Sequence, residues 1–272
     1  MTDPIFDLNG KVAIITGASG ALASSVAKSL ARSKVTVALL TRNPDSITSL
    51  VDEIIGSGGN AIAVEADILN EKSLLGARDR ILKLYGKIDI LLNIAGGNLP
   101  GATVAPGQTI FDISIDDFNA VAKLNLNGTV IPSLIFGKVM ADQKKGIIIN
   151  YSSMAADRII TRVAGYSASK AAMENFTRWM AVEMATKFGD NIRVNAIAPG
   201  FFVGKQNKKL LINDDGSYTE RGQTIIRNTP MGRFGEADEL NGTIHFLCSE
   251  ASRFITGVVI PVDGGFSAFS GV

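Results

Sequence analysis

A tyrosine and a lysine stand four residues apart in the segment Tyr166-Ser167-Ala168-Ser169-Lys170. In a helix, residues at this spacing share one face, one turn apart. The positive charge of the lysine favours the phenolate, so we expect it to lower the pKa of Tyr166 from about 10 toward neutrality. Tyr166 would then give or take a proton at physiological pH. The same spacing is common on helix surfaces, so the rest of the chain has to decide between the two interpretations.

The composition favours a single domain that binds a small molecule. The chain has 272 residues, of which 46% are hydrophobic and 19% are charged, so it can bury one large core. We expect residues 1–272 to form one domain. The formal net charge is +1 and no block of like charge occurs, which argues against nucleic acid and an anionic membrane as partners. A small-molecule substrate is the expected partner.

Signals for targeting, membrane insertion and metal binding are weak. The first residues lack the basic and apolar regions of a signal peptide, and the apolar runs are too short to span a bilayer. We therefore expect a cytoplasmic protein. The single cysteine, Cys248, excludes an internal disulfide, and with the single histidine, His245, it makes at most a fragment of a metal site. No metal is predicted.

Short β-branched runs alternate with longer stretches of helical composition. The runs are continuously apolar, as expected for parallel strands that helices cover on both faces. The predicted fold is α/β, a Rossmann-type doubly wound sheet of about seven parallel strands. The least regular region, residues 200–230, follows the sixth strand and is predicted to be a mobile insertion near the substrate. The candidate strands are 12–16, 35–40, 61–65, 88–92, 147–151, 193–198 and 258–262.

A turn of small residues follows the first candidate strand and opens a candidate helix over 21–33. It reads Thr16-Gly17-Ala18-Ser19-Gly20-Ala21-Leu22-Ala23. Free backbone amides at a helix N-terminus, together with the helix dipole, suit a pyrophosphate group. A glycine-containing turn alone is weak evidence, but its position after the first strand of an α/β chain is the context that dinucleotide binding requires.

The end of the second strand bears on the choice of cofactor. An acidic residue there would bind the ribose of NAD, whereas this chain has Thr41 and Arg42. Thr41 does not repel a 2′-phosphate and Arg42 can pair with one, so NADP(H) is favoured over NAD(H). The alternative is that Arg42 is a solvated loop residue and that either cofactor binds.

Two further strand ends complete the predicted dinucleotide site. Asp67, followed by Ile68, could accept a hydrogen bond from the adenine amino group or cap the next helix. The stretch from Asn93 to Asn98 contains small residues that would let a cofactor lie close to the backbone.

Taken together, these residues resemble the short-chain dehydrogenase/reductase family, from the Thr16-Gly17 turn to Asp263-Gly264-Gly265. The family's motif is T-G-x-x-x-G-x-G; here Ala21 and Ala23 replace the last two glycines, and Gly20 stands one place earlier. The family's N-N-A-G segment appears as Asn93-Ile94-Ala95-Gly96, and its Pro-Gly as Pro199-Gly200. The resemblance implies a cofactor-binding set of Gly17, Ser19, Gly20, Ala21, Leu22, Thr41, Arg42, Asp67, Ile68, Asn93, Ala95, Gly96, Tyr166, Lys170, Pro199 and Gly200.

The family's catalytic residues also have counterparts in this chain. The family serine lies thirteen residues before the tyrosine, which gives Ser153, and the helix asparagine corresponds to Asn125. The resemblance implies hydride transfer between a nicotinamide and a carbonyl or alcohol carbon, with Tyr166 as acid or base. Ser153 would hydrogen bond the substrate oxygen, and Asn125 would hold a water. Lys170 would lower the pKa of Tyr166 and bind the nicotinamide ribose.

Residues 95–98, 198–207 and 263–272 resemble more narrowly the D-mannonate oxidoreductase (fructuronate reductase) branch of the family. That branch interconverts a keto-uronate and a hexonate. The predicted substrate-binding residues are Asn98, Ser153, Gln206 and Asn207, whose polar groups suit sugar hydroxyls. Positive charge for a carboxylate is available at Lys205, Lys208, Arg158 and Arg162, and the sequence leaves open which of them meets it.

Two other functions remain in view. Within the same family, the chain could be a 3-oxoacyl thioester reductase or a gluconate-type dehydrogenase. A different class is a non-catalytic dinucleotide sensor, but such a protein would not need Asn125, Ser153, Tyr166 and Lys170 together. The resemblance also implies a homotetramer or homodimer, as is usual in the family.

Overall fold

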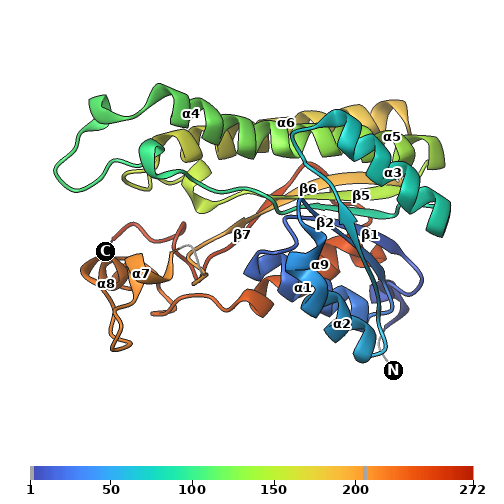
Figure 1. Ribbon diagram of the computed structural model, residues 1–272, viewed down its shortest axis with the longest axis horizontal. Helices are drawn as coiled ribbons and strands as arrows, with labels where there is room; N and C mark the ends of the chain where they lie inside the picture. The colour runs from blue at the N-terminus through green and yellow to red at the C-terminus, as the bar shows by residue number, and fades with distance from the viewer. Residues whose placement is uncertain (1–2, 205–206, 272) are drawn as a thin grey trace.

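The computed structural model describes residues 3–204 and 207–271, and its centre is one seven-stranded sheet (Figure 1). The strand order is β3-β2-β1-β4-β5-β6-β7, and every neighbouring pair is parallel. The predicted doubly wound sheet is therefore confirmed, with strand bounds that differ by one or two residues. The strands are β1 (Val12–Thr16), β2 (Thr36–Thr41), β3 (Asn60–Glu65), β4 (Ile90–Asn93), β5 (Gly146–Tyr151), β6 (Ile192–Pro199) and β7 (Val259–Val262).

Helices cover both faces of the sheet (Figure 1). One layer contains α1 (Ala21–Arg32), α2 (Thr48–Gly56) and α9 (Asn241–Cys248). The other contains α3 (Glu71–Tyr85), α4 (Ile115–Ala122), α5 (Gly128–Gln143) and α6 (Ala164–Lys187). The segment predicted as an insertion carries the short helices α7 (Lys208–Leu211) and α8 (Glu220–Arg227). Among the described residues, none of these helices is long and apolar enough to cross a membrane.

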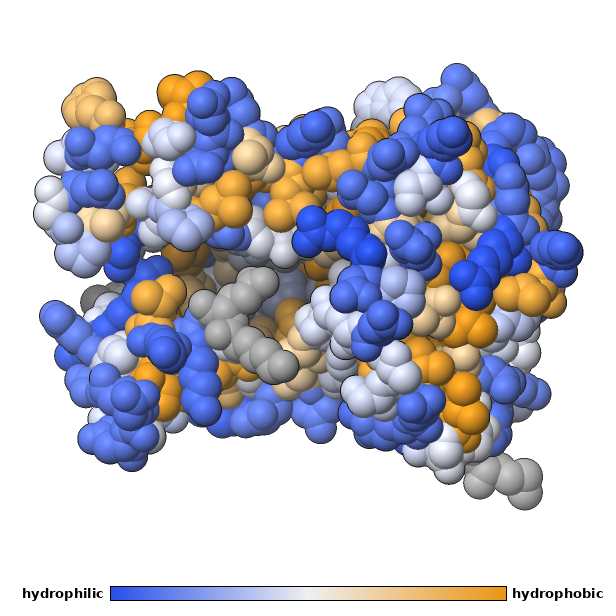
Figure 2. Space-filling model, viewed as in Figure 1, coloured by the Kyte–Doolittle hydropathy of each residue, from blue (hydrophilic) through white to orange (hydrophobic). Residues whose placement is uncertain are grey.

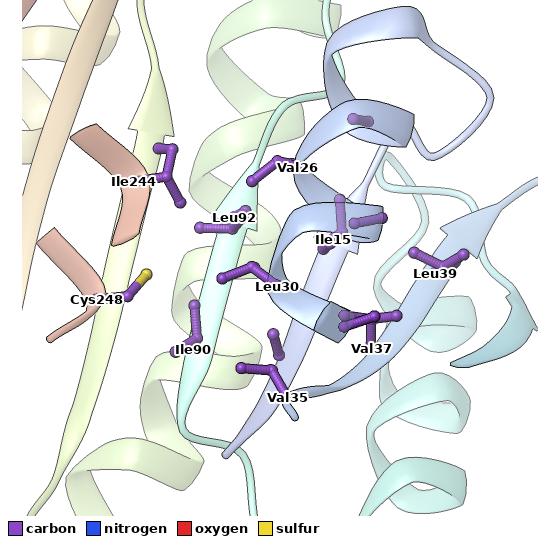
Figure 3. Close-up of a cluster of buried hydrophobic side chains, with 14 of the residues drawn as sticks. Ile15, Val26, Leu30, Val35, Val37, Leu39, Ile90, Leu92, Ile244 and Cys248 are labelled. Carbon is purple, nitrogen blue, oxygen red and sulfur yellow. The ribbon is translucent and has the colours of Figure 1, made fainter. Parts of the chain in front are cut away.

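Each inner strand contributes to two hydrophobic cores because successive side chains point to opposite faces. Ile14 and Ile15 are both fully buried, yet they belong to different clusters. Ile15 packs in the cluster on the α1 side, together with Leu30 (Figure 3). Ile14 packs in the cluster on the α6 side, together with Phe136. This two-sided burial explains why the strands read as continuous apolar runs.

The order in which strands are added to the sheet reverses between β1 and β4. From β1 the chain winds outward through β2 and β3 and then crosses back to β4, on the other side of β1. The loops that follow β1 and β4 therefore leave the same sheet edge toward opposite sides. In open α/β sheets, such a point at the carboxyl ends of the strands is where ligands bind.

Candidate active site

The turn after β1 has the geometry of a dinucleotide-binding turn. Gly17 has φ of +69°, and a β-carbon there would lie 2.8 Å from the Ala95 Cα, so only glycine fits. Gly20 is the N-cap of α1, and no side chain caps the helix. The first backbone amides of α1 are thus free for a pyrophosphate. Ser19, Gly20 and Ala21 are exposed at this turn.

The alanines that replace family glycines are explained by the start of the helix. Ala21 is already the first residue of α1, and Ala23 is buried within its first turn. Both positions have helical backbone, which does not require glycine. The departures from the glycine motif therefore leave the turn intact.

Thr16 connects the two loops that meet at the switch point, a role the sequence analysis missed. Its hydroxyl accepts hydrogen bonds from the backbone amides of Ile94 (3.0 Å) and Ala95 (3.1 Å). It also donates to the Leu92 carbonyl at 3.4 Å. Thr16 is fully buried, so these bonds fix the β4 loop against the glycine turn. A threonine at the carboxyl end of the first strand was the available signal.

The Asn93 side chain lies in a buried network of hydrogen bonds. It is 2% exposed, and its amide group donates to the Ser133 hydroxyl at 2.9 Å and to the Asn150 Oδ1 at 2.8 Å. The Asn150 amide in turn donates to the Thr177 hydroxyl at 2.8 Å. This chain of bonds ties β4 and β5 to α5 and α6. The side chain of Asn93 thus serves the core, and its predicted contact with the cofactor stays a prediction.

Asn125 and Lys170 converge on the β4 loop at Gly96. A β-carbon at Gly96 would lie 2.7 Å from the Asn125 Oδ1 and 3.3 Å from the Lys170 Nζ. Asn125 lies in a π-helical turn, Lys123–Asn127, between α4 and α5, a distortion that often marks functional sites. Its amide donates to the carbonyls of Gly97 (2.7 Å) and Val121 (2.8 Å). Its Oδ1 accepts from the Gly97 amide at 3.1 Å.

Asn125 therefore holds the β4 loop with its side chain. The side-chain amide of Asn125 is already hydrogen-bonded to Gly97 and Val121. The predicted contact between Asn125 and a water stays a prediction.

Ser153, Tyr166 and Lys170 come together from β5 and α6. Ser153 follows the end of β5, and Tyr166 and Lys170 lie one turn apart near the start of α6. The Lys170 Nζ lies 5.6 Å from the centroid of the Tyr166 ring. The predicted helical pairing of the phenol and the ammonium group is thus present, with the serine beside it.

The pKa of Tyr166 is raised rather than lowered. Burial disfavours the phenolate and is the dominant cause, while a side-chain hydrogen bond with Ser153 lowers the pKa in part. Burial also lowers the pKa of Lys170, to about 8, so most of the lysine still carries its charge at neutral pH. The expectation that the pKa of Tyr166 falls toward neutrality is therefore wrong for the protein alone, and the phenol is protonated at neutral pH.

Lys170 is fixed by partners that the sequence analysis did not identify. It is 4% exposed, and its ammonium group donates to the Tyr151 carbonyl at 2.7 Å. The carboxylate of Glu174, one turn further along α6, raises the pKa of Lys170 and partly offsets burial. Glu174 itself accepts from the Ser152 hydroxyl at 2.6 Å. Ser152 and Glu174 thus support the lysine from the side away from the β4 loop.

The remaining predicted cofactor residues lie at the carboxyl ends of β2, β3 and β6. The Thr41 hydroxyl accepts from the Asn43 amide at 3.3 Å, and Arg42 is exposed. Asp67 is half-buried beside Ile68 and accepts from the Leu69 amide at 2.9 Å, while Asn70 caps α3. A β-carbon at Gly200, next to Pro199, would lie 2.7 Å from the Asp263 Cα.

The predicted substrate residues have unequal outcomes. The Asn98 amide donates to the Thr103 hydroxyl at 2.7 Å, and its Oδ1 is buried with no hydrogen-bond partner in the described chain. Asn207 is committed to its own loop: it donates to the Phe202 carbonyl at 2.9 Å and accepts from the Gly204 amide at 2.7 Å. Asn207 thus shapes the loop, and its predicted role in binding substrate stays a prediction. Gln206 and its neighbour Lys205 lie outside the described residues.

A family model described as Enoyl-(Acyl carrier protein) reductase matches residues 17–267. This match spans the glycine turn, the catalytic residues and β7. The chain belongs to the short-chain dehydrogenase/reductase family. It is therefore an oxidoreductase that acts on CH–OH or C=O groups, and the predicted family is confirmed.

Relatives in this family match nearly the whole chain. The uncharacterized oxidoreductase UxuB of Bacillus subtilis (strain 168) is 46% identical over 98% of this chain and 98% of its own. The crystal structure of a candidate D-mannonate oxidoreductase from Haemophilus influenza with bound NAD is 43% identical, covers 98% of each chain and has a TM-score of 0.91. A gluconate 5-dehydrogenase structure from Burkholderia cenocepacia, in complex with NADP and tartrate, is 29% identical, covers 97% of this chain and 98% of its own, and has a TM-score of 0.86.

The site fits a nicotinamide dinucleotide. The free amides of α1 suit its pyrophosphate, and glycine at positions 17 and 96 lets the two loops, Asn125 and Lys170 approach one another closely. The relatives bind NAD or NADP, so the coarser cofactor prediction is confirmed, and the preference for NADP stays a prediction.

Replacing Thr16 with valine tests the connection between the two loops. Thr16→Val keeps the shape but removes the acceptor for two backbone amides, which should lower the free energy of unfolding by about 1–3 kcal/mol and weaken nicotinamide binding. Urea denaturation and a cofactor titration measure the two effects. Thr16→Ser keeps the hydroxyl and is the matched control. Equal behaviour of the two variants would contradict the assigned role.

Replacing Tyr166 with phenylalanine tests the proton-transfer role. Tyr166→Phe removes only the hydroxyl, so turnover should fall about 100-fold or more while the cofactor still binds. Steady-state kinetics and a fluorescence titration of the reduced cofactor measure the two effects. Undiminished activity would refute Tyr166 as the acid or base.

Proposed function

We propose that this protein interconverts a keto-uronate and a hexonate, of the D-fructuronate and D-mannonate type, by hydride transfer. The observation that carries the chemistry is the convergence of Lys170 and Asn125 on the loop after β4, beside Ser153 and Tyr166. The substrate class is supported by the likeness to the candidate D-mannonate oxidoreductase, at 43% identity. The gluconate 5-dehydrogenase with tartrate is a second relative named for a hydroxy-acid substrate.

The residues of this chain handle the proton and the oxygen of the substrate. A bound nicotinamide supplies or accepts the hydride. Tyr166 is protonated at neutral pH because its pKa is raised, so it can donate to the oxygen of a carbonyl that is being reduced. The Ser153 hydroxyl would hydrogen bond the same oxygen as negative charge develops on it.

Lys170 supports this step from the side. Its ammonium group already donates to the Tyr151 carbonyl, and it has further N–H donors for a ribose hydroxyl. In the oxidation direction, its charge favours the phenolate that Tyr166 needs as a base. We also propose that Asn125 holds a water through which the proton of Tyr166 is exchanged.

The cofactor is proposed to be NADP(H) in preference to NAD(H). Thr41 presents a hydroxyl in place of a carboxylate at the end of β2. Among the described residues, the exposed Arg42 makes no ion pair, so its guanidinium can turn toward a 2′-phosphate. The candidate D-mannonate oxidoreductase binds NAD, so the two cofactors have to be compared directly.

The assembly is proposed to be a homodimer or homotetramer of one-domain subunits. All seven strands belong to one sheet, which suits a single folding unit. Large apolar side chains are exposed on neighbouring helices of one layer: Leu134 of α5 is 58% exposed, and Trp179 and Val182 of α6 are 63% and 65% exposed. A second copy of the chain would cover them.

The proposed substrate is tested by a comparison of three substrate classes. D-Mannonate, D-gluconate and a 3-oxoacyl thioester are each offered with NAD(H) and NADP(H), and the reduced nicotinamide is followed by absorbance. We expect D-mannonate to be oxidised with the highest kcat/KM. Reaction with the thioester alone would favour the 3-oxoacyl thioester reductase. Binding of cofactor without any turnover would favour a dinucleotide sensor.

The proposed cofactor preference is tested at Arg42. Arg42→Ala should weaken NADP binding about tenfold, through loss of a charged hydrogen bond, and leave NAD binding unchanged. The dissociation constants of both cofactors measure this difference. Arg80→Ala, which removes an exposed arginine from α3, is the control. An equal change for NAD and NADP would refute the phosphate contact.

A further inference from the structure

A cavity lies beside the chain segment between Ser153 and Tyr166, and none of its lining residues belongs to the cofactor site described above. Its volume is about 520 Å³. It is lined by the segment 158–162, by Phe201 after β6, by α8 and by the C-terminal segment. The first of these segments connects Ser153 to Tyr166 along the chain. Figure 2 shows the molecule hollowed on this side, between α4 above and helices α7 and α8 below.

The charged side chains around the cavity give it an excess of positive charge. Arg158, Arg162 and Arg221 line it, against the single carboxylate of Glu220. Arg158 is already engaged, since it pairs with Asp157 at 3.5 Å and donates to the Ser267 carbonyl. Arg162 and Arg221 are both half-buried. Neither has a carboxylate within 4.0 Å among residues 3–204 and 207–271.

Arg162 and Arg221 are close enough to repel each other. The pKa of Arg221 is lowered by burial first and by the charge of Arg162 second. Two guanidinium groups that share a partly buried space attract an anion between them, and a carboxylate matches their planar donor geometry. The pair thus has the chemistry of a carboxylate-binding site.

The position of Arg162 is fixed from both ends. Its backbone has φ of +79°, an unfavourable conformation for a residue with a β-carbon. Two hydrogen bonds with Val104 hold it there: the Val104 amide donates to the Arg162 carbonyl at 2.9 Å, and the Arg162 Nε donates to the Val104 carbonyl at 2.6 Å. These bonds engage the carbonyl and Nε of Arg162 but not its terminal guanidinium nitrogens, and the residue lines the cavity. Arg162 also precedes α6 by two residues, so it is tied to the catalytic helix.

The other wall of the cavity is apolar. Phe201 and Phe266 pack edge to face with ring centroids 5.1 Å apart, and Phe269 lies beside the same space. Apolar walls exclude water and strengthen the attraction between a bound anion and the arginines. Phe201 directly follows Gly200 at the end of β6, so this wall extends to the predicted cofactor site.

We propose that Arg162 and Arg221, in the cavity lined by segment 158–162 and α8, form a subsite for the carboxylate of the substrate. This inference rests on the proposed function, because it takes a sugar acid as the substrate. It selects anionic sugar acids over neutral sugars and polyols. Arg221 determines specificity through charge, and Arg162 positions the anion relative to the catalytic helix.

Arg221→Gln tests the subsite without touching the hydrogen bonds that hold Arg162. For D-mannonate, we expect this variant to raise KM about tenfold, as for loss of a charged hydrogen bond, with kcat little changed. The neutral methyl ester of the same acid should be turned over equally by the variant and the unmodified protein. Arg227→Gln removes an exposed arginine from the same helix and should leave both KM values unchanged. An unchanged KM for the acid, or an equal rise for acid and ester, would overturn the proposal.

A binding measurement separates failure of the subsite from failure of the proposed function. If no sugar acid is turned over, isothermal titration calorimetry of the cofactor-saturated protein with D-mannonate and D-mannitol still tests the subsite. Binding of D-mannonate that Arg221→Gln weakens about tenfold and Arg227→Gln does not would support the subsite, while the proposed reaction would fall. Equal binding of the acid and the neutral polyol, or no binding of either, would overturn the subsite.

Discussion

The close approach of two loops at the switch point is the constraint on which the site depends. Gly17 and Ala95 are so near that no side chain fits at position 17, and the Thr16 hydroxyl holds the amides of the second loop. The same loop receives Asn125 and Lys170 at its next residues. Cofactor turn, catalytic lysine and π-helical turn are therefore positioned against one short piece of backbone. These groups are held in place because the contact distances at Gly17 and Gly96 leave no space for a side chain.

Burial controls the electrostatics of the catalytic residues. Removal from water raises the pKa of Tyr166 and lowers that of Lys170, so burial opposes the charged form of each group. Ser153 acts against this trend at the tyrosine, and Glu174 acts against it at the lysine. The pKa values of Tyr166 and Lys170 thus depend on burial and on the polar groups that oppose it. An added charge or dipole near the two residues would shift both values. This explains why the four-residue spacing alone gave the wrong direction for the tyrosine.

The sequence predicted what repeats along the chain and missed what only packing creates. Continuous apolar runs such as 12–16 and 147–151 indicated the parallel sheet, because strands buried on both faces cannot alternate. The motif spacing placed Ser153, Tyr166 and Lys170 correctly near the ends of β5 and α6. The direction of the Asn93 side chain could not be read from a motif, since adjacent strand residues face opposite sides.

The pairing of Arg162 with Arg221 was equally out of reach of the sequence. The two residues are far apart in the chain, and only the position of α8 brings them to one cavity. The hydrogen bonds of Asn207 within its own loop were also not evident from the sequence. The sequence shows which polar side chains are present. Long-range packing decides which of them are left without hydrogen-bond partners and can bind a ligand.

The cavity that contains Arg162 and Arg221 is lined by two segments with different further roles, 158–162 and α8. This difference affects how the substrate preference of such a protein can change. The segment 158–162 joins Ser153 to Tyr166, so a change there also disturbs the catalytic helix. Helix α8 carries Arg221 and no catalytic residue. New substrate preferences would therefore arise more readily by exchange of α8 and its flanking loops, while the opposite wall is held constant by the chemistry. The fold thus places Arg221 on an element that can change in sequence and Arg162 on a segment tied to α6.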